Sequence, residues 1–244
     1  MRDPVQLCDL LGLPPTLHQS ARQAAEQFPL CAPLEFVGRM QPGNPHDPLL
    51  RQILPLADEL GDVPGYHPDP VDDAAAALQP GLLQKYPGRV LIVTTPTCAV
   101  HCRFCFRRHF DHAATPRTWD DWQPAWDQIA ADPTVREVVL SGGDPLMLPD
   151  PRLQLLLRHL ESIPHLRRLR VHRRLAIVIP QRVTDELIAC LRATRLTTLL
   201  VVHANHANEI DSQVEQALAH LAQRGITLLN HSVLLAGVND STEA

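Results

Sequence analysis

The sequence predicts an α/β fold, in which a partial (incomplete) TIM-type βα barrel follows a helical, loop-rich N-terminal segment that wraps around it. Three observations predict this fold. Short β-branched runs alternate with helical stretches after residue 88, polar residues follow each run, and prolines crowd the residues before it. Strands alternating with helices indicate βα units around a parallel sheet. We therefore expect an N-terminal proline-rich helical extension at residues 1–88 and a barrel core at residues 89–244.

The extension is expected to be irregular, because proline interrupts both helices and central strands. Short helices are predicted there at residues 20–27 and 72–78. In the core, apolar runs predict strands at residues 90–93, 138–140, 169–172, 199–203 and 226–229, and the last can continue to residue 235. Helices are predicted at residues 119–131, 151–162, 184–193 and 211–224. Thr184 is a suitable N-cap for the third helix and Gly225 a suitable C-cap for the fourth.

Composition and charge narrow the classes of protein. The chain has 244 residues, of which 45% are hydrophobic and 20% charged, and this excludes wholesale disorder. The net charge is −5 at pH 7, so no global basic field points to nucleic acid. The arginine run at residues 167–170, with Arg173 and Arg174, is expected to be a solvated face. No apolar run is long enough to span a membrane and no secretory signal is evident, so we expect a cytoplasmic protein with free thiols.

Polar side chains follow every predicted strand of the core. They lie at residues 94–95, 141–144, 172–174, 203–206 and 230–232. The carboxyl ends of parallel strands meet at the edge of a βα barrel where enzymes of this fold carry out their chemistry. Polar residues also end strands without any function, but five such clusters together indicate an enzyme.

Three cysteines lie in the loop after the first core strand. Cys98, Cys102 and Cys105 have the spacing Cys-x3-Cys-x2-Cys, so three thiolates can surround one metal centre from a single loop. Four protein ligands occupy every iron of an ordinary iron–sulfur cluster. Three cysteines therefore leave one iron open to a substrate or cofactor.

Two other interpretations of these cysteines remain open. A zinc site could use His101 or His109 as its fourth ligand. Inert buried cysteines are the second alternative. The remaining cysteines, Cys8, Cys31 and Cys190, are isolated in the sequence, and we expect them in the core.

The cysteine spacing resembles that of the radical S-adenosylmethionine (SAM) superfamily. Downstream motifs resemble the lysine 2,3-aminomutase family, and most closely its branch that makes β-lysine for the modification of elongation factor P. The resemblance runs from about residue 20 to the end of the sequence. Its four ordered motifs are Cys-Arg-Phe-Cys-Phe-Arg-Arg-His-Phe at residues 102–110, Leu-Ser-Gly-Gly-Asp-Pro-Leu at 140–146, Ile-Pro-Gln-Arg-Val-Thr at 179–184 and Ser-Val-Leu-Leu-Ala-Gly-Val-Asn-Asp at 232–240.

This resemblance implies an isomerase with three cofactors. A [4Fe-4S] cluster held by Cys98, Cys102 and Cys105 would bind SAM at its fourth iron and cleave it to a 5′-deoxyadenosyl radical. That radical would take a hydrogen atom from the β-carbon of lysine, which pyridoxal phosphate (PLP) carries while the amino group moves from C2 to C3. The implied partners are a small-molecule substrate, lysine, and a reductant such as flavodoxin.

Site residues follow from the same motifs. Ser141, Gly142, Gly143 and Asp144 match the family's SAM-contacting loop, where glycines let backbone approach a ligand closely. A plain strand-to-helix turn is the alternative for this loop. Arg107 matches the residue that binds the lysine carboxylate, a bidentate task that suits a guanidinium. A surface arginine is the alternative for Arg107, and its neighbour Arg108 is expected to be one.

Further residues are assigned to the cofactor pocket. Arg89 matches a PLP-phosphate contact, and Lys85 stands where the aminomutases have another arginine. His203, Asn205 and His206 follow the fourth core strand, with a purely structural role as the alternative. His231 stands where the family has a glutamine near PLP, and Ala236 stands where arginine is usual.

The largest departure concerns the PLP-anchoring lysine and the acidic residues that hold the substrate ammonium group. In the family both lie on a further C-terminal stretch, whereas Lys85 is the only lysine of this sequence and does not match the anchor. We therefore expect a shortened aminomutase that keeps its cluster and SAM loop but has weak or no turnover. The alternatives are a PLP-independent radical SAM enzyme and a zinc-stabilised, non-enzymatic domain that acts through its proline-rich segment.

Overall fold

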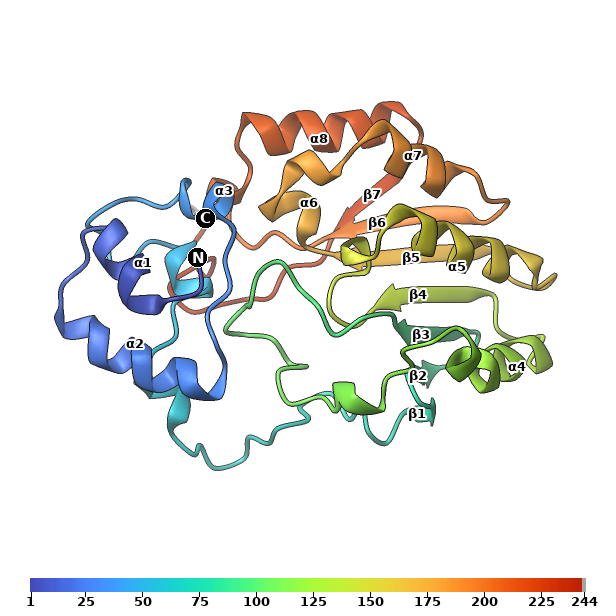
Figure 1. Ribbon diagram of the computed structural model, residues 1–244, viewed down its shortest axis with the longest axis horizontal. Coiled ribbons are helices and arrows are strands. Elements are labelled where there is room, and N and C mark those ends of the chain that lie inside the picture. The colour runs from blue at the N-terminus through green and yellow to red at the C-terminus, as the bar shows by residue number, and fades with distance from the viewer. Residues whose placement is uncertain (243–244) are drawn as a thin grey trace.

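A seven-stranded sheet is the centre of the computed structural model, which describes residues 1–242 (Figure 1). Strand order follows the chain from β1 to β7. The strands are Ala77–Gln79 (β1), Leu82–Tyr86 (β2), Arg89–Val93 (β3), Glu137–Ser141 (β4), Arg168–Arg173 (β5), Thr197–Val202 (β6) and Thr227–Asn230 (β7). β1, β2 and β3 pair antiparallel, and β3 to β7 pair parallel. The predicted α/β fold with an incomplete barrel is confirmed, because the sheet is open, with β1 and β7 at its edges.

The register brings the carboxyl ends of the parallel strands together. Val93 of β3 pairs with Ser141 of β4, and Val202 of β6 pairs with Arg173 of β5 and Asn230 of β7. The predicted extension of the last strand to residue 235 is wrong, since β7 ends at Asn230. The loops that carry the polar clusters therefore start from one edge of the sheet.

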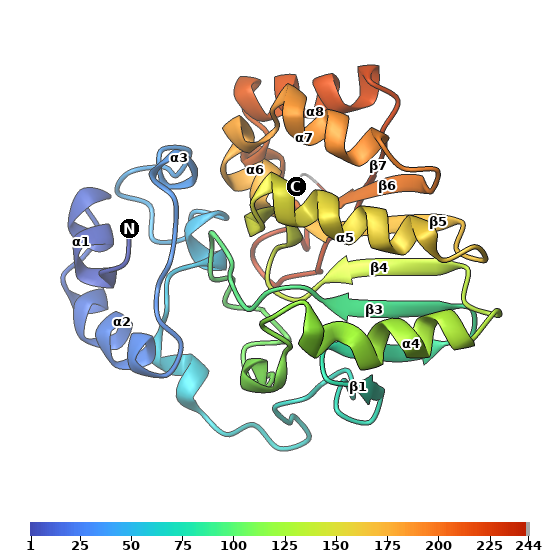
Figure 2. The same cartoon turned by 45° about the vertical axis from the view of Figure 1, so that its right-hand side comes forward.

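Four helices cover one face of the parallel strands (Figure 2). They are α4 (Gln123–Ala131), α5 (Asp150–Ser162), α7 (Asp185–Arg192) and α8 (Ser212–Gln223). The side chains of Thr184 and Asp211 accept hydrogen bonds from the first turns of α7 and α8, as expected of N-caps. Gly225 follows α8 with a φ of 81°, which confirms the predicted glycine stop.

Shorter helices connect these elements. They are η3 (His112–Ala114), η4 (Asp120–Trp122), η5 (Pro145–Met147), α6 (Leu175–Val178), η6 (Pro180–Arg182) and η7 (Ala207–Glu209). None of the helices in residues 1–242 is long and apolar enough to cross a membrane.

The N-terminal segment packs beyond the carboxyl ends of the strands (Figure 1). It contains α1 (Pro4–Leu10), α2 (Thr16–Gln27), α3 (Leu34–Val37), η1 (Leu50–Gln52) and η2 (Ala57–Leu60). Its apolar residues, including Leu7, Phe36 and Ile53, are fully buried and belong to the same core cluster as the sheet. The division at residue 88 stays a prediction, and the structure adds that β1 and β2, before that residue, pair into the sheet.

The predicted helix at residues 72–78 is wrong. Asp72 has a φ of 54°, outside the right-handed helical region, and the Asp69 carboxylate holds the next turn by accepting hydrogen bonds from the amides of Asp73 and Ala74. Ala77 then pairs with Leu83 in a strand. Pairing with β2 therefore outweighs the helical preference of the alanine run.

Candidate functional site

A cavity of about 140 Å³ lies at the carboxyl ends of the parallel strands. Its lining residues run from Cys98 to Val233, and they include the cysteine loop and the loop after β4. The predicted site residues on its wall are Cys98, Cys102, Cys105, Arg107, Ser141, Gly142, Gly143, Asp144, His203 and His231. The fold therefore brings together nearly all of the residues that the motifs selected.

The cysteine loop takes its shape from the N-terminal segment behind it. The amide of His101 donates to the carbonyl of Cys31 at 2.8 Å, and the amide of Arg103 donates to the carbonyl of Gln52 at 2.8 Å. The guanidinium of Arg103 is paired with Glu59 and donates to the carbonyl of Phe28. These contacts hold an irregular loop that has no regular secondary structure of its own.

The three thiols share one buried environment. Burial raises the pKa of Cys98, Cys102 and Cys105, and at Cys102 the charge and hydrogen bond of Arg174 oppose that rise. Among residues 1–242, no three His, Cys, Asp or Glu side chains converge closely enough to hold a metal ion. Thiolate ligands suit an iron–sulfur cluster, so the donor set fits a cluster once the cysteine side chains rearrange and lose their protons.

Neither histidine proposed as a zinc ligand lines the cysteine cavity. His101 stacks on Phe28 with ring centroids 5.1 Å apart, and its Nδ1 lies 2.8 Å from the carbonyl oxygen of Pro29. His109 lines other cavities, next to Phe106. His109 shares one of these cavities with Cys105, but among residues 1–242 neither imidazole converges with the three thiols on a metal site.

The isolated cysteines have different surroundings. Cys8 and Cys190 are buried in the core, as predicted. Cys31 is only partly buried, and its thiol donates to the carbonyl of Ala99 at 3.4 Å, inside the cysteine loop. The core assignment of Cys31 is therefore wrong, because the N-terminal segment brings it against that loop.

The backbone conformation and close packing of the loop after β4 require glycine at positions 142 and 143. Gly142 has a φ of 111°, and a Cβ on Gly143 would lie 2.3 Å from the carbonyl oxygen of Thr97. The amide of Gly143 donates to Thr95 at 2.6 Å and that of Asp144 donates to Thr97 at 2.8 Å. These contacts fix the loop after β4 against the residues that lead into the cysteine loop.

The carboxylate of Asp144 binds backbone amides of two neighbouring loops. Its oxygens accept hydrogen bonds from the amides of Leu146 at 3.0 Å, Arg174 at 2.7 Å and Leu175 at 2.6 Å. Burial raises the pKa of this carboxyl group even though these hydrogen bonds oppose the rise. Asp144 thereby ties the loop after β4 to the end of β5.

Arg107 is buried and already has partners. Its Nε donates to Asp73 at 2.7 Å, and one terminal nitrogen donates to the Ser141 hydroxyl at 3.1 Å. The other oxygen of Asp73 lies 2.6 Å from the ammonium group of Lys85. Arg108 is not a free surface arginine either, because it is paired with Glu59 at 2.9 Å. The sequence did not single out Asp73, whose role depends on a long-range contact.

Arg173 is the least compensated cation of the cavity wall. It is 3% exposed, and none of its three guanidinium nitrogens has a hydrogen-bond partner among the described residues. Burial lowers its pKa to about 10, although the charge of Asp144 opposes this. Arg173 and Arg174 therefore do not belong to a solvated face, and that prediction is wrong for them. An anionic ligand in the cavity would satisfy Arg173.

Three imidazoles form a group on the wall. The rings of His203 and His231 lie 5.4 Å apart, and those of His172 and His231 lie 5.8 Å apart. Burial, followed by the charge of Arg174, lowers the pKa of His203 to about 4, and burial with His231 does the same for His172. His172 was missed as a site residue, although its place at the end of β5 was a usable signal.

Arg89 is the predicted site residue that lies outside this cavity. It borders a second cavity of about 170 Å³, whose wall also carries Lys85, Arg170 and His172. His172 lines both cavities. The buried Glu137 pairs with Arg89 at 3.0 Å and with Arg170 at 2.7 Å.

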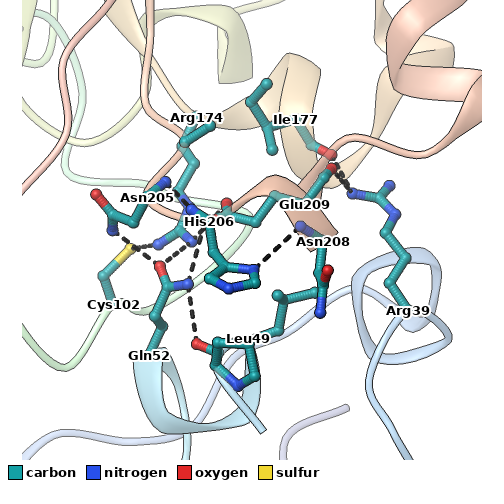
Figure 3. A network of polar contacts seen from close by, with 12 residues as sticks. Arg39, Leu49, Gln52, Cys102, Arg174, Ile177, Asn205, His206, Asn208 and Glu209 are labelled. Carbon is teal, nitrogen blue, oxygen red and sulfur yellow. Dashed lines mark hydrogen bonds and ion pairs between the residues drawn. The ribbon is translucent and has the colours of Figure 1, made fainter. Parts of the chain in front are cut away.

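Asn205 and His206 do not line the cysteine cavity. The Nδ1 of His206 accepts from the amide of Asn208 at 3.1 Å, which caps η7. Asn205 lies in a buried polar network with Gln52 and Glu209 (Figure 3). The structural alternative therefore describes both residues.

Comparisons with known proteins agree with the motifs. A family model described as the radical SAM superfamily matches residues 92–244. L-lysine 2,3-aminomutase of Escherichia coli (strain K12) is 47% identical over 242 residues, which are 99% of this chain and 70% of that protein. The Haemophilus influenzae protein of the same name is 45% identical over 241 residues, and the alignment covers 99% and 71% of the two chains. The Buchnera aphidicola protein of the same name is 42% identical over 221 residues, which are 91% of this chain and 65% of that protein.

Proposed function

Because the chain belongs to the radical SAM superfamily and to its lysine 2,3-aminomutase family, we propose that it converts L-lysine to β-lysine. One observation carries the proposal above all. The cysteine loop and the loop at residues 141–144 line one cavity at the carboxyl ends of the strands. When bound, a [4Fe-4S] cluster and SAM supply a carbon radical that removes hydrogen, and PLP lets the nitrogen migrate.

The chain's own residues divide the work of holding these groups. Cys98, Cys102 and Cys105 ligate three irons and leave the fourth for SAM. The loop after β4 would hold SAM next to the cluster, since its backbone is hydrogen-bonded to Thr95 and Thr97, which lead into the cysteine loop. The unpartnered guanidinium of Arg173 fits a carboxylate of SAM.

The second cavity suits the phosphate of PLP. Lys85, Arg89 and Arg170 surround it, and the buried Glu137 compensates part of their charge. Lys85 is paired with Asp73, so this lysine contributes a point charge to the phosphate rather than a covalent anchor. His172 separates this cavity from the cysteine cavity and can pack against the cofactor ring as a neutral imidazole.

Arg107 is proposed to receive the substrate carboxylate. Asp73 and Ser141 hold Nε and Nη1 of Arg107, and these contacts orient its remaining nitrogen, Nη2. The imidazole rings of His203 and His231 complete the wall that keeps water from a reactive radical. We assign the reaction to the cytoplasm, with a flavodoxin-type reductant as electron donor and elongation factor P as the acceptor of the β-lysine.

The test is electron paramagnetic resonance of protein that is reconstituted without oxygen and reduced with dithionite. A [4Fe-4S]⁺ signal that changes shape on addition of SAM is expected, followed by formation of β-lysine from lysine when PLP is supplied. A signal whose shape does not change on addition of SAM would overturn the proposed radical SAM chemistry. SAM cleavage without any effect of PLP or lysine would instead favour a PLP-independent radical SAM enzyme. Zinc without iron or sulfide would favour the zinc-stabilised domain.

A further inference from the structure

Arg174 contacts one of the three cysteines directly. Its Nη1 donates to the sulfur of Cys102 at 2.7 Å, and its Nη2 donates to Gln52 at 2.7 Å and to Glu209 at 2.9 Å (Figure 3). Arg174 is buried, and Glu209 is fully buried. The guanidinium therefore sits between a carboxylate and a thiol sulfur, away from water.

A rigid frame fixes the direction of this guanidinium. One oxygen of Glu209 accepts from the side chain of Gln52 at 3.0 Å and from the amide of Asn205 at 2.9 Å, and the side chain of Asn205 donates back to Gln52 at 2.9 Å. Arg39 donates to the backbone carbonyl of Glu209 at 3.0 Å. Residues from the N-terminal segment, the end of β5 and the loop after β6 therefore meet at one point.

Aromatic rings complete the surroundings. The guanidinium carbon lies 5.3 Å from the ring centre of Phe36 and 5.5 Å from that of Phe104. These apolar faces exclude water, so the charge of Arg174 is weakly screened at Cys102. Among the described residues, no other arginine side chain donates a hydrogen bond to a cysteine sulfur.

We propose that Arg174 is a positioning residue that donates an N–H to the Cys102 sulfur of the assembled cluster and raises the cluster's reduction potential. The proposal rests on the proposed function, because it needs a [4Fe-4S] cluster at the three cysteines. Reduction adds one electron from an external donor, and a cation that hydrogen-bonds a ligand sulfur stabilises that added negative charge. Hydrogen bonds to cluster sulfurs are among the features that set these potentials.

The frame also separates Arg174 from an ordinary structural arginine. Glu209 accepts a hydrogen bond from Nη2 of Arg174, whereas Nη1 donates to the sulfur, so one donor arm stays directed at Cys102. A change in Glu209 should therefore alter the potential in the opposite direction from a change in Arg174. A residue that only supports the fold would not produce two opposite shifts.

The experiment is a redox titration of the anaerobically reconstituted full chain, followed by the [4Fe-4S]⁺ resonance signal. The double variant Arg174→Gln/Glu209→Gln removes the charge pair without changing net charge, and its potential should fall. At a fixed applied potential, the ratio of reduced to oxidised cluster should be about tenfold lower than in the unaltered protein. For a one-electron couple, this corresponds to a reduction potential lower by about 59 mV. Glu209→Gln alone leaves the cation less compensated, and its potential should rise.

Arg182→Gln/Asp150→Asn is the matched control. It removes a partly buried arginine–aspartate pair that makes no hydrogen bond to Cys98, Cys102 or Cys105, and its potential should equal that of the unaltered protein. If the double variant does not fold, Arg174→Lys carries the test, because lysine can keep the Glu209 pair but has no second arm for the sulfur. Its potential should also fall.

Equal potentials in all variants that assemble a cluster would overturn the role of Arg174 and leave the proposed function intact. Failure of the unaltered protein to assemble any cluster would overturn both. Shifts of the same sign in the Arg174 and Glu209 variants would also contradict the proposal, because they would indicate a general loosening of the site.

Discussion

The Nε of Arg107 donates to the buried carboxylate of Asp73 at 2.7 Å. This contact joins the cysteine loop to the turn that precedes β1. Because Asp73 also pairs with Lys85 at 2.6 Å, one carboxylate supports two cations that we assign to different ligands. The wall of the site is thus held by a residue that belongs to none of its motifs.

Asp73→Asn should destabilise the protein strongly. The variant leaves Arg107 buried without its counter-charge, and loss of one partner of a buried pair costs about 3–5 kcal/mol. Urea unfolding measured with circular dichroism would give the free energy of unfolding. Asp62→Asn, at an exposed position, is the control and should stay within about 0.5 kcal/mol of the unaltered protein. Equal stability of the two variants would show that the pair with Arg107 contributes little.

Gly143→Ala should disrupt the loop after β4. The added Cβ would lie 2.3 Å from the carbonyl oxygen of Thr97, which is backbone and cannot move away cheaply. Iron content after reconstitution and the midpoint of thermal unfolding should both fall. Gly61→Ala is the control, since its nearest contact is an ordinary 3.5 Å. A Gly143→Ala protein with full iron content would contradict the proposed link between the two loops.

The Arg173→Met substitution should weaken SAM binding without lowering the stability of the fold. SAM binding should weaken by about tenfold, because a charge-assisted contact to a carboxylate is lost. Stability should rise or stay equal, since an unpaired buried charge is removed. Calorimetric titration of reconstituted protein with SAM and a thermal melt provide the two readouts. Arg168→Met, on the exposed part of the same strand, should leave SAM affinity unchanged, and unchanged affinity in Arg173→Met would refute the assignment.

Substitution of Cys98, Cys102 or Cys105 by alanine should abolish cluster assembly, whereas the Cys31→Ala variant should still assemble the cluster. Cys31 only donates a hydrogen bond to the carbonyl of Ala99, and its removal leaves the three proposed ligands in place. Iron and sulfide analysis after anaerobic reconstitution distinguishes the variants. Loss of iron in Cys31→Ala would mean that this residue is a fourth ligand, contrary to the open iron proposed here.

His172 should make the protein less stable in mild acid. Burial, then His231 and the arginines Arg170, Arg107 and Arg89, lower its pKa from 6.5 to about 4. Between these two values the unfolded chain binds a proton that the folded protein does not, so stability falls as the pH drops through 6.5 and levels off below about 4. The loss at about pH 5 should reach about 2 kcal/mol.

Thermal melts at neutral pH and at about pH 5 test this dependence. His172→Gln should reduce the acid-induced loss, because glutamine does not titrate. His220→Gln is the control, since His220 is partly exposed on α8. An unchanged acid-induced loss in His172→Gln would show that this imidazole does not control it.

Local sequence patterns predict the parallel sheet, the covering helices and the cysteine loop. Hydrophobic periodicity and capping residues such as Thr184 and Gly225 act over a few residues, so they can be recognised from the local sequence. The motif spacing selected the cysteines and the loop at residues 141–144, since both lie at the ends of strands that can be recognised locally.

Long-range contacts decide which charged side chains of the site have partners. Arg107, Arg173 and Arg174 stand close together in the fold, yet one is paired with Asp73, one is unpartnered and one is held by Glu209 and Gln52. The same holds for the chain at residues 72–79, where pairing with β2 replaced the predicted helix. These outcomes depend on partners tens to more than a hundred residues away, and the energies of burial and charge pairing are set by those partners rather than by the neighbouring sequence.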